Sequence, residues 1–138
     1  MKNTGTLIIS FAVFTTALVS VIVDWNSSHI FNPDWPPHAR FHDVLLLIFM
    51  SQLAVLFLWL MWKPGAGWSE HVYGFLYVAF FWSPFFYITF LVPSSSLGLE
   101  PEPPASLGSI PIYPNVIVGL VEIVIAGVGL WFYKKQPV

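Results

Sequence analysis

The stretch VLLLIFMSQLAVLFLWLMW, residues 44–62, contains no charged side chain. An α-helix rises about 1.5 Å per residue, so about 20 apolar residues are enough to cross the hydrocarbon core of a membrane. Three further segments, residues 5–23, 72–92 and 115–133, lack Lys, Arg and Asp over comparable lengths. The sequence therefore predicts four transmembrane helices.

The composition of the whole chain supports this prediction. Of the 138 residues, 57% are hydrophobic and 9% are charged, whereas a soluble globular protein has about 25% charged residues. The length is that of one domain. The expected fold is all-α: an integral membrane bundle of four transmembrane helices over residues 1–138, with helices at about 5–23, 37–62, 72–92 and 115–133.

Positive charges predict the orientation of the bundle in the membrane. One side of a four-helix chain carries every lysine, at positions 2, 63, 134 and 135, and the opposite side carries only Arg40. Because positive residues favour the cytoplasmic side, both termini are expected to be cytoplasmic. The two longer loops, 24–43 and 93–114, then lie on the non-cytoplasmic side.

The second outer loop, 93–114, is rich in Pro, Ser and Gly, which predicts neither a helix nor a strand. It is either a flexible spacer or a lid over the bundle. In the first outer loop, Pro36 or Pro37 is expected to begin the second helix, because proline is favoured at the first helical position.

Polar residues gather in the segment NPDWPPHARFHD, residues 32–43. On a helix that begins at Pro36 or Pro37, His38 and His42 lie on one face, and Arg40 and Asp43 are spaced to form an ion pair. One interpretation is a polar cap that meets lipid headgroups, with Trp35 at headgroup level. The other is a site in which the histidines act as acid/base groups or as metal ligands.

The histidine pair alone does not complete a metal site. An H-x-x-x-H pair supplies half of a metal site, and a zinc or iron site needs a third ligand, for which His29 and Asp24 are candidates. No cofactor is predicted, and if a metal binds, His38 and His42 are its expected ligands. The chain has no Cys, which excludes disulfides and thiolate sites. The net charge of −2, with no basic run, argues against nucleic acid as a partner.

Glu122 is an ionisable residue inside an apolar run, which makes it a functional candidate. Helix rise places it about 10 Å below the outer boundary, and Gln52 and Ser83 about 13 Å below. Helical phase puts Gln52 and Phe49 in line with His38 and His42. The sequence therefore predicts an outward-facing pocket with the histidines at its mouth and Gln52 and Glu122 at its floor. Alternatively, a protonated Glu122 hydrogen-bonds to Gln52 and joins two helices.

The segment 72–92 carries many aromatic residues and one proline, Pro84, which is expected to kink its helix. These aromatic residues serve either as packing and lipid-facing bulk or as the wall of a pocket for a lipophilic molecule. On the second interpretation the pocket wall includes Trp82 and Tyr87.

The run NPDWPPHARFH resembles the signature of a family of small, largely uncharacterised four-helix membrane proteins, and the resemblance covers residues 30–43 and the four-span layout. In layout alone the chain is similar to the emopamil-binding and sterol-isomerase group, whose members have an acidic residue at the end of helix 1, here Asp24. That resemblance implies an aromatic pocket for lipophilic molecules. The catalytic motif of that group does not match these positions.

Three functions stay open. The first is binding or acid/base isomerisation or cyclisation of an isoprenoid, sterol or quinone in the bilayer. The second is a non-catalytic subunit or assembly factor, with a membrane protein or a second copy as partner. The third is a His-ligated metal or haem protein. For the first, the predicted catalytic residues are Glu122, His42, His38, Arg40, Asp43 and Asp24, and the predicted substrate-binding residues are Gln52, Phe49, Ser83, Trp82, Tyr87 and Trp35.

Overall fold

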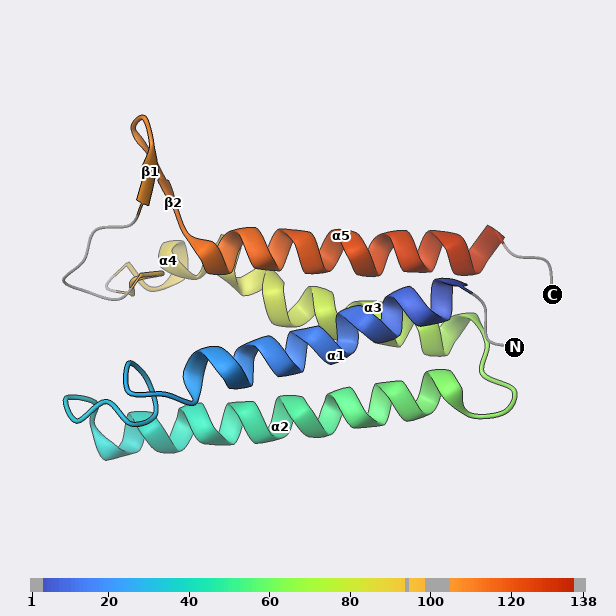
Figure 1. The fold of residues 1–138 in the computed structure, drawn as a ribbon, viewed down its shortest axis with the longest axis horizontal. Helices are drawn as coiled ribbons and strands as arrows, with labels where there is room; N and C mark the ends of the chain where they lie inside the picture. Colours follow the sequence, from blue (N-terminus) through green and yellow to red (C-terminus); the bar gives the residue numbers. More distant parts are fainter. Residues whose placement is uncertain (1–3, 94, 99–104, 136–138) are drawn as a thin grey trace.

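Four long helical segments lie side by side in a bundle in the computed structural model, which describes residues 4–93, 95–98 and 105–135 (Figure 1). They are α1 (Thr4–Asp24), α2 (Pro37–Trp62), α3 (Trp68–Trp82) and α5 (Pro114–Lys135). Helices α1 and α3 each pack against both α2 and α5. Lys2 and the part of the second outer loop at 99–104 lie outside the described residues.

Three of these helices, α1, α2 and α5, are long and apolar enough to cross a membrane. The chain is thus mostly helical, with helices compatible with an integral membrane protein. Bulky apolar side chains cover the outside of the bundle, as a hydrocarbon solvent permits. Examples are Phe11, Val55 and Phe80, which are 56%, 68% and 70% exposed.

The predicted helix at 72–92 differs from the observed structure. The observed helix, α3, begins earlier, at Trp68, and ends at Trp82. A 3₁₀ turn, η1 (Ser83–Phe86), follows, and a short helix, α4 (Ile88–Leu91), completes the segment. Proline has no N–H and its ring clashes with the preceding turn, so Pro84 accounts for the end of the regular helix.

The prediction that the second outer loop contains no strand is wrong. β1 (Ala105–Leu107) pairs antiparallel with β2 (Ile110–Ile112), and Ser106 lies opposite Pro111. Gly108 has a φ of +65°, which glycine adopts without strain, and it opens the two-residue turn between the strands. The fold is therefore a helical bundle with one small hairpin, rather than all-α in the strict sense.

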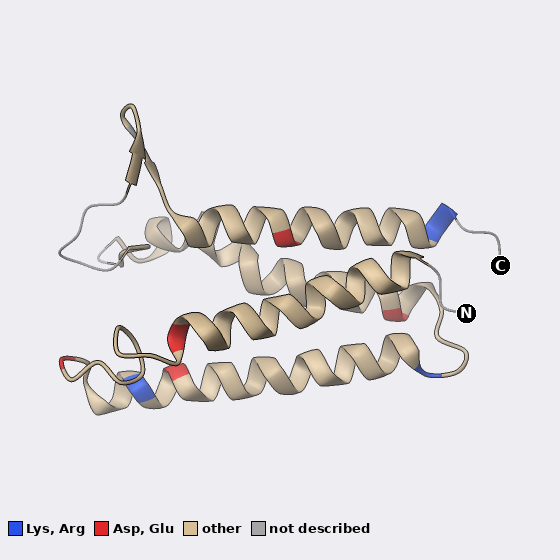
Figure 2. Ribbon diagram, viewed as in Figure 1, with Lys and Arg blue, Asp and Glu red and all other residues tan. Residues whose placement is uncertain are grey.

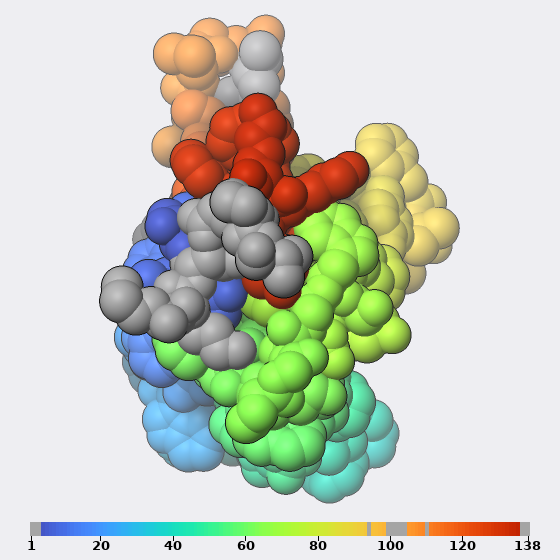
Figure 3. Space-filling view, turned by 90° about the vertical axis from the view of Figure 1, so that its right-hand side faces the viewer, coloured from blue at the N-terminus to red at the C-terminus, as the bar shows by residue number. Residues whose placement is uncertain are grey.

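The hairpin and the α4 segment protrude from the bundle, as the orange and yellow parts of the end-on view show (Figure 3). The described ends of the chain and the 63–67 connection lie at one end of the bundle, and the 25–36 loop and the hairpin lie at the other (Figure 1). We call these the inner and the outer end. Among the described residues, the charged positions lie towards the two ends of the bundle, except for one acidic position within α5 (Figure 2), which is Glu122.

The closest approach in the core is between α1 and α5. A methyl group added at Gly5 would lie 2.5 Å from the carbonyl oxygen of Gly129, and one added at Gly129 would lie 2.9 Å from the backbone nitrogen of Ile9. Small residues permit this contact between helix backbones. The surrounding core consists of Ile9, Ala12, Val13, Met50, Ala54, Met61, Tyr77, Val78, Trp82 and Ala126.

The inner end is fixed by a buried histidine. His71 on α3 is 1% exposed, and its Nε2 lies 2.8 Å from the hydroxyl of Thr6 on α1. Its ring stacks on that of Tyr133 on α5, with centroids 3.6 Å apart. This residue therefore ties three helices together, far from the outer loops.

Candidate functional site

Two aspartates and a histidine meet at the outer end of α1 and α2. Asp24 is the last residue of α1, and its Oδ1 lies 3.6 Å from Nε2 of His29 in the following loop. Asp43 lies in the second turn of α2, at the same end of the bundle and within electrostatic range of Asp24 and His29. We call Asp24, His29 and Asp43 the outer cluster.

The 25–36 loop holds His29 in place through local bonds. Ser28 donates hydrogen bonds from its N–H and its hydroxyl to Oδ1 of Asn26, at 2.7 and 2.6 Å. Nδ1 of His29 lies 2.9 Å from that hydroxyl, and the ring meets Trp35 edge-on with centroids 5.5 Å apart. These are the side-chain bonds expected of Ser and Asn in turns. Trp35 therefore supports the cluster from the loop.

Arg40 and Asp43 do not form the predicted ion pair within the described part of the chain. Nη2 of Arg40 donates to the carbonyl oxygen of Pro33 at 3.2 Å. Nε of Arg40 and Oδ2 of Asp43 are buried atoms without a hydrogen-bond partner among the described residues. Since Arg40 and Asp43 are three residues apart, they lie on neighbouring parts of one helix face. An unused donor and an unused acceptor therefore lie beside the outer cluster.

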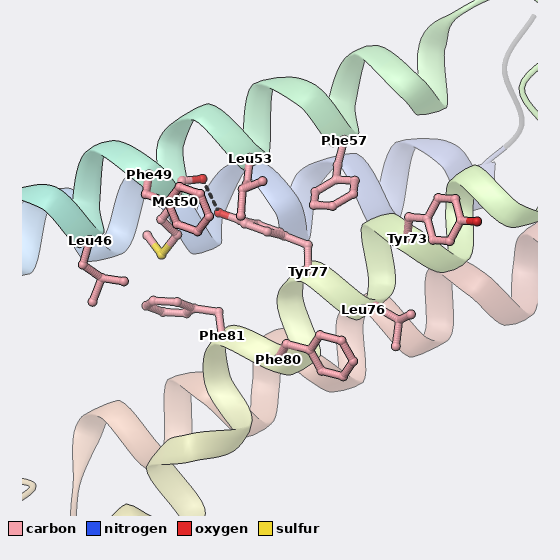
Figure 4. A pocket seen from close by; sticks show the side chains of 10 residues that line it. All are labelled: Leu46, Phe49, Met50, Leu53, Phe57, Tyr73, Leu76, Tyr77, Phe80 and Phe81. Carbon is pink, nitrogen blue, oxygen red and sulfur yellow. Dashed lines mark hydrogen bonds between the residues drawn. The ribbon is translucent and has the colours of Figure 1, made fainter.

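An apolar groove begins one turn further along α2. It has a volume of about 390 Å³ and lies between α2 and α3 (Figure 4). Six of its ten lining residues are aromatic, and the full set is Leu46, Phe49, Met50, Leu53, Phe57, Tyr73, Leu76, Tyr77, Phe80 and Phe81. The hydroxyl of Tyr77 donates to the carbonyl oxygen of Met50 at 3.1 Å, which links the two helices across the groove.

The groove and the outer cluster share a face of α2. At about 100° per residue, Asp43 and Met50 differ by only about 20° in direction. Leu46 is three residues from Asp43, a rise of about 4.5 Å along the helix. Asp43 therefore lies just beyond the outer end of the groove.

Gln52 and Glu122 do not meet, which corrects the predicted pocket floor. Gln52 is exposed on the outside of α2, and Phe49, on the same predicted line, is 57% exposed. The inward face of α2 instead carries Leu47, Met50, Ala54 and Met61. The groove between α2 and α3 is lined by neither His42, Gln52 nor Glu122. Of the predicted line, only Phe49 reaches the groove.

Glu122 connects α5 to α1. It is 6% exposed, and its Oε2 accepts a hydrogen bond of 3.0 Å from the hydroxyl of Thr15. Nearby, the indole N–H of Trp82 on α3 donates to the hydroxyl of Thr16 at 3.0 Å, and Gly119 packs against the Trp82 side chain. Thr15 and Glu122 thus link α1 to α5, and Thr16 and Trp82 link α1 to α3. Trp82 is buried and does not line the groove.

The other predicted residues lie apart from the outer cluster or on the surface. Ser83 begins η1, and Tyr87, 45% exposed, separates η1 from α4. His38 and His42 are exposed in the first turns of α2, and their Nε2 atoms are 3.0 Å apart. Among the described residues, no group of three or more His, Asp or Glu side chains is arranged to hold a metal ion.

A comparison with known protein families matches residues 8–136 to the Family of unknown function (DUF6640). The chain belongs to this family. Searches among curated proteins and among solved structures found no match. The match of this DUF6640 protein covers α2, α3, α5 and most of α1, and therefore both the outer cluster and the groove.

Sequence reasoning about this DUF6640 protein missed the groove and gave His29 only a supporting role. The groove residues are apolar and lie in helices that are apolar on all sides, so their sequence carries no signal for a shared surface. His29 had a usable signal, since it follows Asp24 by five residues across a short turn. The hairpin had one too, because a Gly-Ser pair between apolar residues is typical of a two-residue turn.

Proposed function

We propose that this DUF6640 protein crosses the membrane four times, with both termini in the cytoplasm. The segment from Trp68 to Leu91, formed by α3, η1 and α4, supplies the fourth crossing beside the three long apolar helices. The lysines near the inner end and Arg40 at the outer end support this orientation through the positive-inside rule. The outer cluster then faces the non-cytoplasmic side.

We further propose that the protein binds a lipophilic small molecule of the isoprenoid, sterol or quinone class. The observation that carries this proposal is the position of Asp43 just beyond the end of an aromatic groove. The groove volume, about 390 Å³, falls in the range of about 300–1,000 Å³ found for ligand sites. Its apolar walls suit a hydrocarbon body, and the outer cluster suits a polar head. The layout resemblance to emopamil-binding proteins supports the same ligand class.

The unused atoms of Arg40 and Asp43 suit a hydroxyl or carbonyl on that head. A hydroxyl can accept from Nε–H of Arg40 and donate to Oδ2 of Asp43, which are buried atoms with no other partner in the described structure. A buried polar atom without a partner costs free energy, so a ligand that satisfies both atoms gains affinity.

Acid/base isomerisation is the chemistry that the outer cluster can perform. Two carboxyl groups at one end of the bundle can act as a pair, one protonated and the other ionised, and Nε2 of His29 lies 3.6 Å from Asp24. The protonated group gives its proton to one carbon of a double bond, and the ionised group removes a proton from a neighbouring carbon. The double bond shifts, and no oxidant or reductant is consumed.

Proton transfer can be tested without knowing the substrate. Purified protein is incubated in D₂O with a sterol, an isoprenoid alcohol or a quinone, and the recovered lipid is analysed by mass spectrometry. Deuterium should enter one of these lipids at carbon with wild type and not with Asp43→Asn. If no lipid class gains deuterium, or if Asp43→Asn exchanges as fast as wild type, the proposed chemistry is wrong.

Binding is tested separately with a pair of tryptophan substitutions on α2. Leu53→Trp fills the groove, whereas Val55→Trp adds the same bulk on the surface, where Val55 is 68% exposed and does not line the groove. Fluorescence transfer from tryptophan to dehydroergosterol, or quenching by a quinone, should be reduced in Leu53→Trp after correction for the added tryptophan, and retained in Val55→Trp. Equal binding by both variants would place the ligand elsewhere.

A further inference from the structure

The histidine pair at the start of α2 is a second polar feature, separate from the outer cluster. His38 and His42 lie four residues apart, and their Nε2 atoms are 3.0 Å from each other. The two rings are nearly perpendicular, with centroids 4.4 Å apart. In a hydrogen bond of this kind one Nε2 carries the proton and the other accepts it. The two Nε2 atoms of the pair therefore lie close enough together to bind the same atom.

We propose that His38 and His42 chelate one Cu²⁺ ion on the non-cytoplasmic surface of the membrane. With both ring protons on Nδ1, both Nε2 lone pairs are available to a metal. Nitrogen atoms 3.0 Å apart, each at a bond length of about 2.0–2.1 Å, subtend an angle of about 95° at the ion. Water completes the coordination, because both histidines are exposed.

The angle distinguishes between metals. Tetrahedral Zn²⁺ prefers an angle near 109°, which at the same bond length requires nitrogens about 3.3–3.4 Å apart. The tetragonal geometry of Cu²⁺ has angles near 90°, and Cu²⁺ also binds nitrogen ligands most tightly among the divalent first-row metals. Both effects favour Cu²⁺ over Zn²⁺, even though the chain supplies only two ligands.

The neighbouring residues keep the pair in position. The ring of Phe41 stacks beside His38 with centroids 6.2 Å apart and meets His42 edge-on at 5.4 Å. Arg40, two residues from each histidine, lies about 200° away around the helix, and its guanidinium is bonded to Pro33 in the loop. The positive charge of Arg40 therefore does not occupy the position of the ion.

The test is titration of the purified full-length protein in detergent with Cu²⁺, followed by electron paramagnetic resonance. Wild type should bind one Cu²⁺ per chain with nitrogen hyperfine structure, and Zn²⁺ should bind more weakly. His38→Ala and His42→Ala should each weaken binding by about tenfold or more, because the second ligand is no longer held in place. His29→Ala, which removes a histidine at the same end but leaves the pair intact, should bind as wild type does.

Three outcomes would overturn the proposal. They are unchanged Cu²⁺ affinity in both alanine variants, an equal loss in His29→Ala, and tighter binding of Zn²⁺ than of Cu²⁺. Circular dichroism of each variant checks the fold, which truncation of the exposed His38 and His42 side chains should not alter. The proposal does not rest on lipid binding, so either one can fail without the other.

Discussion

The hydroxyl of Thr15 on α1 donates a hydrogen bond to the carboxyl of Glu122 on α5, across the interface between the first and last helices. Glu122 is thereby a residue that joins helices, and it does not line the groove between α2 and α3. The sequence alone had made Glu122 the foremost catalytic candidate. The proposed chemistry now rests on Asp24, His29 and Asp43 instead.

Glu122→Gln should keep both the fold and the deuterium exchange, because the amide oxygen can still accept from Thr15. Thr15→Val should destabilise the bundle by about 0.6 kcal/mol and at most about 1.7 kcal/mol, the range for such bonds in membranes. Unfolding in a denaturing detergent measures both variants. A folded Glu122→Gln variant without exchange would return Glu122 to the catalytic role.

Gly5→Ala should strongly destabilise the protein, because the new methyl group would meet backbone atoms of α5, which cannot move aside independently. Gly127→Ala is the matched control on α5, where the nearest atom is a ring carbon of Phe75 at 3.8 Å. Thermal unfolding in detergent compares the two. Equal stability of both variants would contradict the close packing of α1 on α5.

Glu70 should make the start of α3 sensitive to acid. Its carboxylate accepts from the N–H of Gly67 at 2.9 Å and lies 3.2 Å from Nζ of Lys63. The hydrogen bond from Gly67 is the main reason why the pKa of Glu70 falls from 4.5 to about 2. A lowered pKa means that the stabilisation is complete above about pH 4.5 and is lost as the pH falls towards 2.

The comparison of wild type with Glu70→Gln isolates this effect from the other carboxyl groups. Wild type should be the more stable at neutral pH, and the difference should shrink between about pH 4.5 and 2. Denaturation curves at a series of pH values give the difference directly. A difference in stability that does not change with pH would rule out the ionisation of Glu70 as its cause.

Single cysteines can report the orientation, because the natural sequence has none. Ser69→Cys, in the first turn of α3 at the inner end, and Ser106→Cys, in the hairpin, both replace exposed serines. In intact cells a membrane-impermeant maleimide should label Ser106→Cys only, and detergent lysis should make Ser69→Cys reactive as well. The opposite pattern would invert the proposed topology, and labelling of both in intact cells would contradict the four-span count.

The long apolar helices could be predicted from the sequence because the length of an uncharged run is a direct measure of its ability to span a membrane. The face that each helix turns towards the bundle interior could not be predicted. These helices are apolar on all sides, so the hydrophobic pattern does not show which face points into the bundle, and close packing of small residues selects the interface. Gln52 consequently lies on the surface of α2, while Gly5 and Gly129 lie at the tightest contact.

The candidate site was predictable in part, for a related reason. Asp24, Arg40 and Asp43 were identified because charged residues are rare in this chain and lie at the ends of spans. Their contacts were not, because Arg40 reaches back to Pro33 and Asp24 lies beside His29 of the loop. Those contacts depend on the path of the 25–36 loop, which local sequence patterns describe poorly.

The direct packing of α1 on α5 has a consequence for biosynthesis. The helices that form the groove, α2 and α3, are neighbours in the chain and can associate as soon as both have left the ribosome. The face of α1 around Gly5, which packs on α5, must wait for the last helix to be made. A nascent chain that stops before Pro114 would therefore present an unfilled α1 surface to the membrane, where quality-control proteases can recognise it.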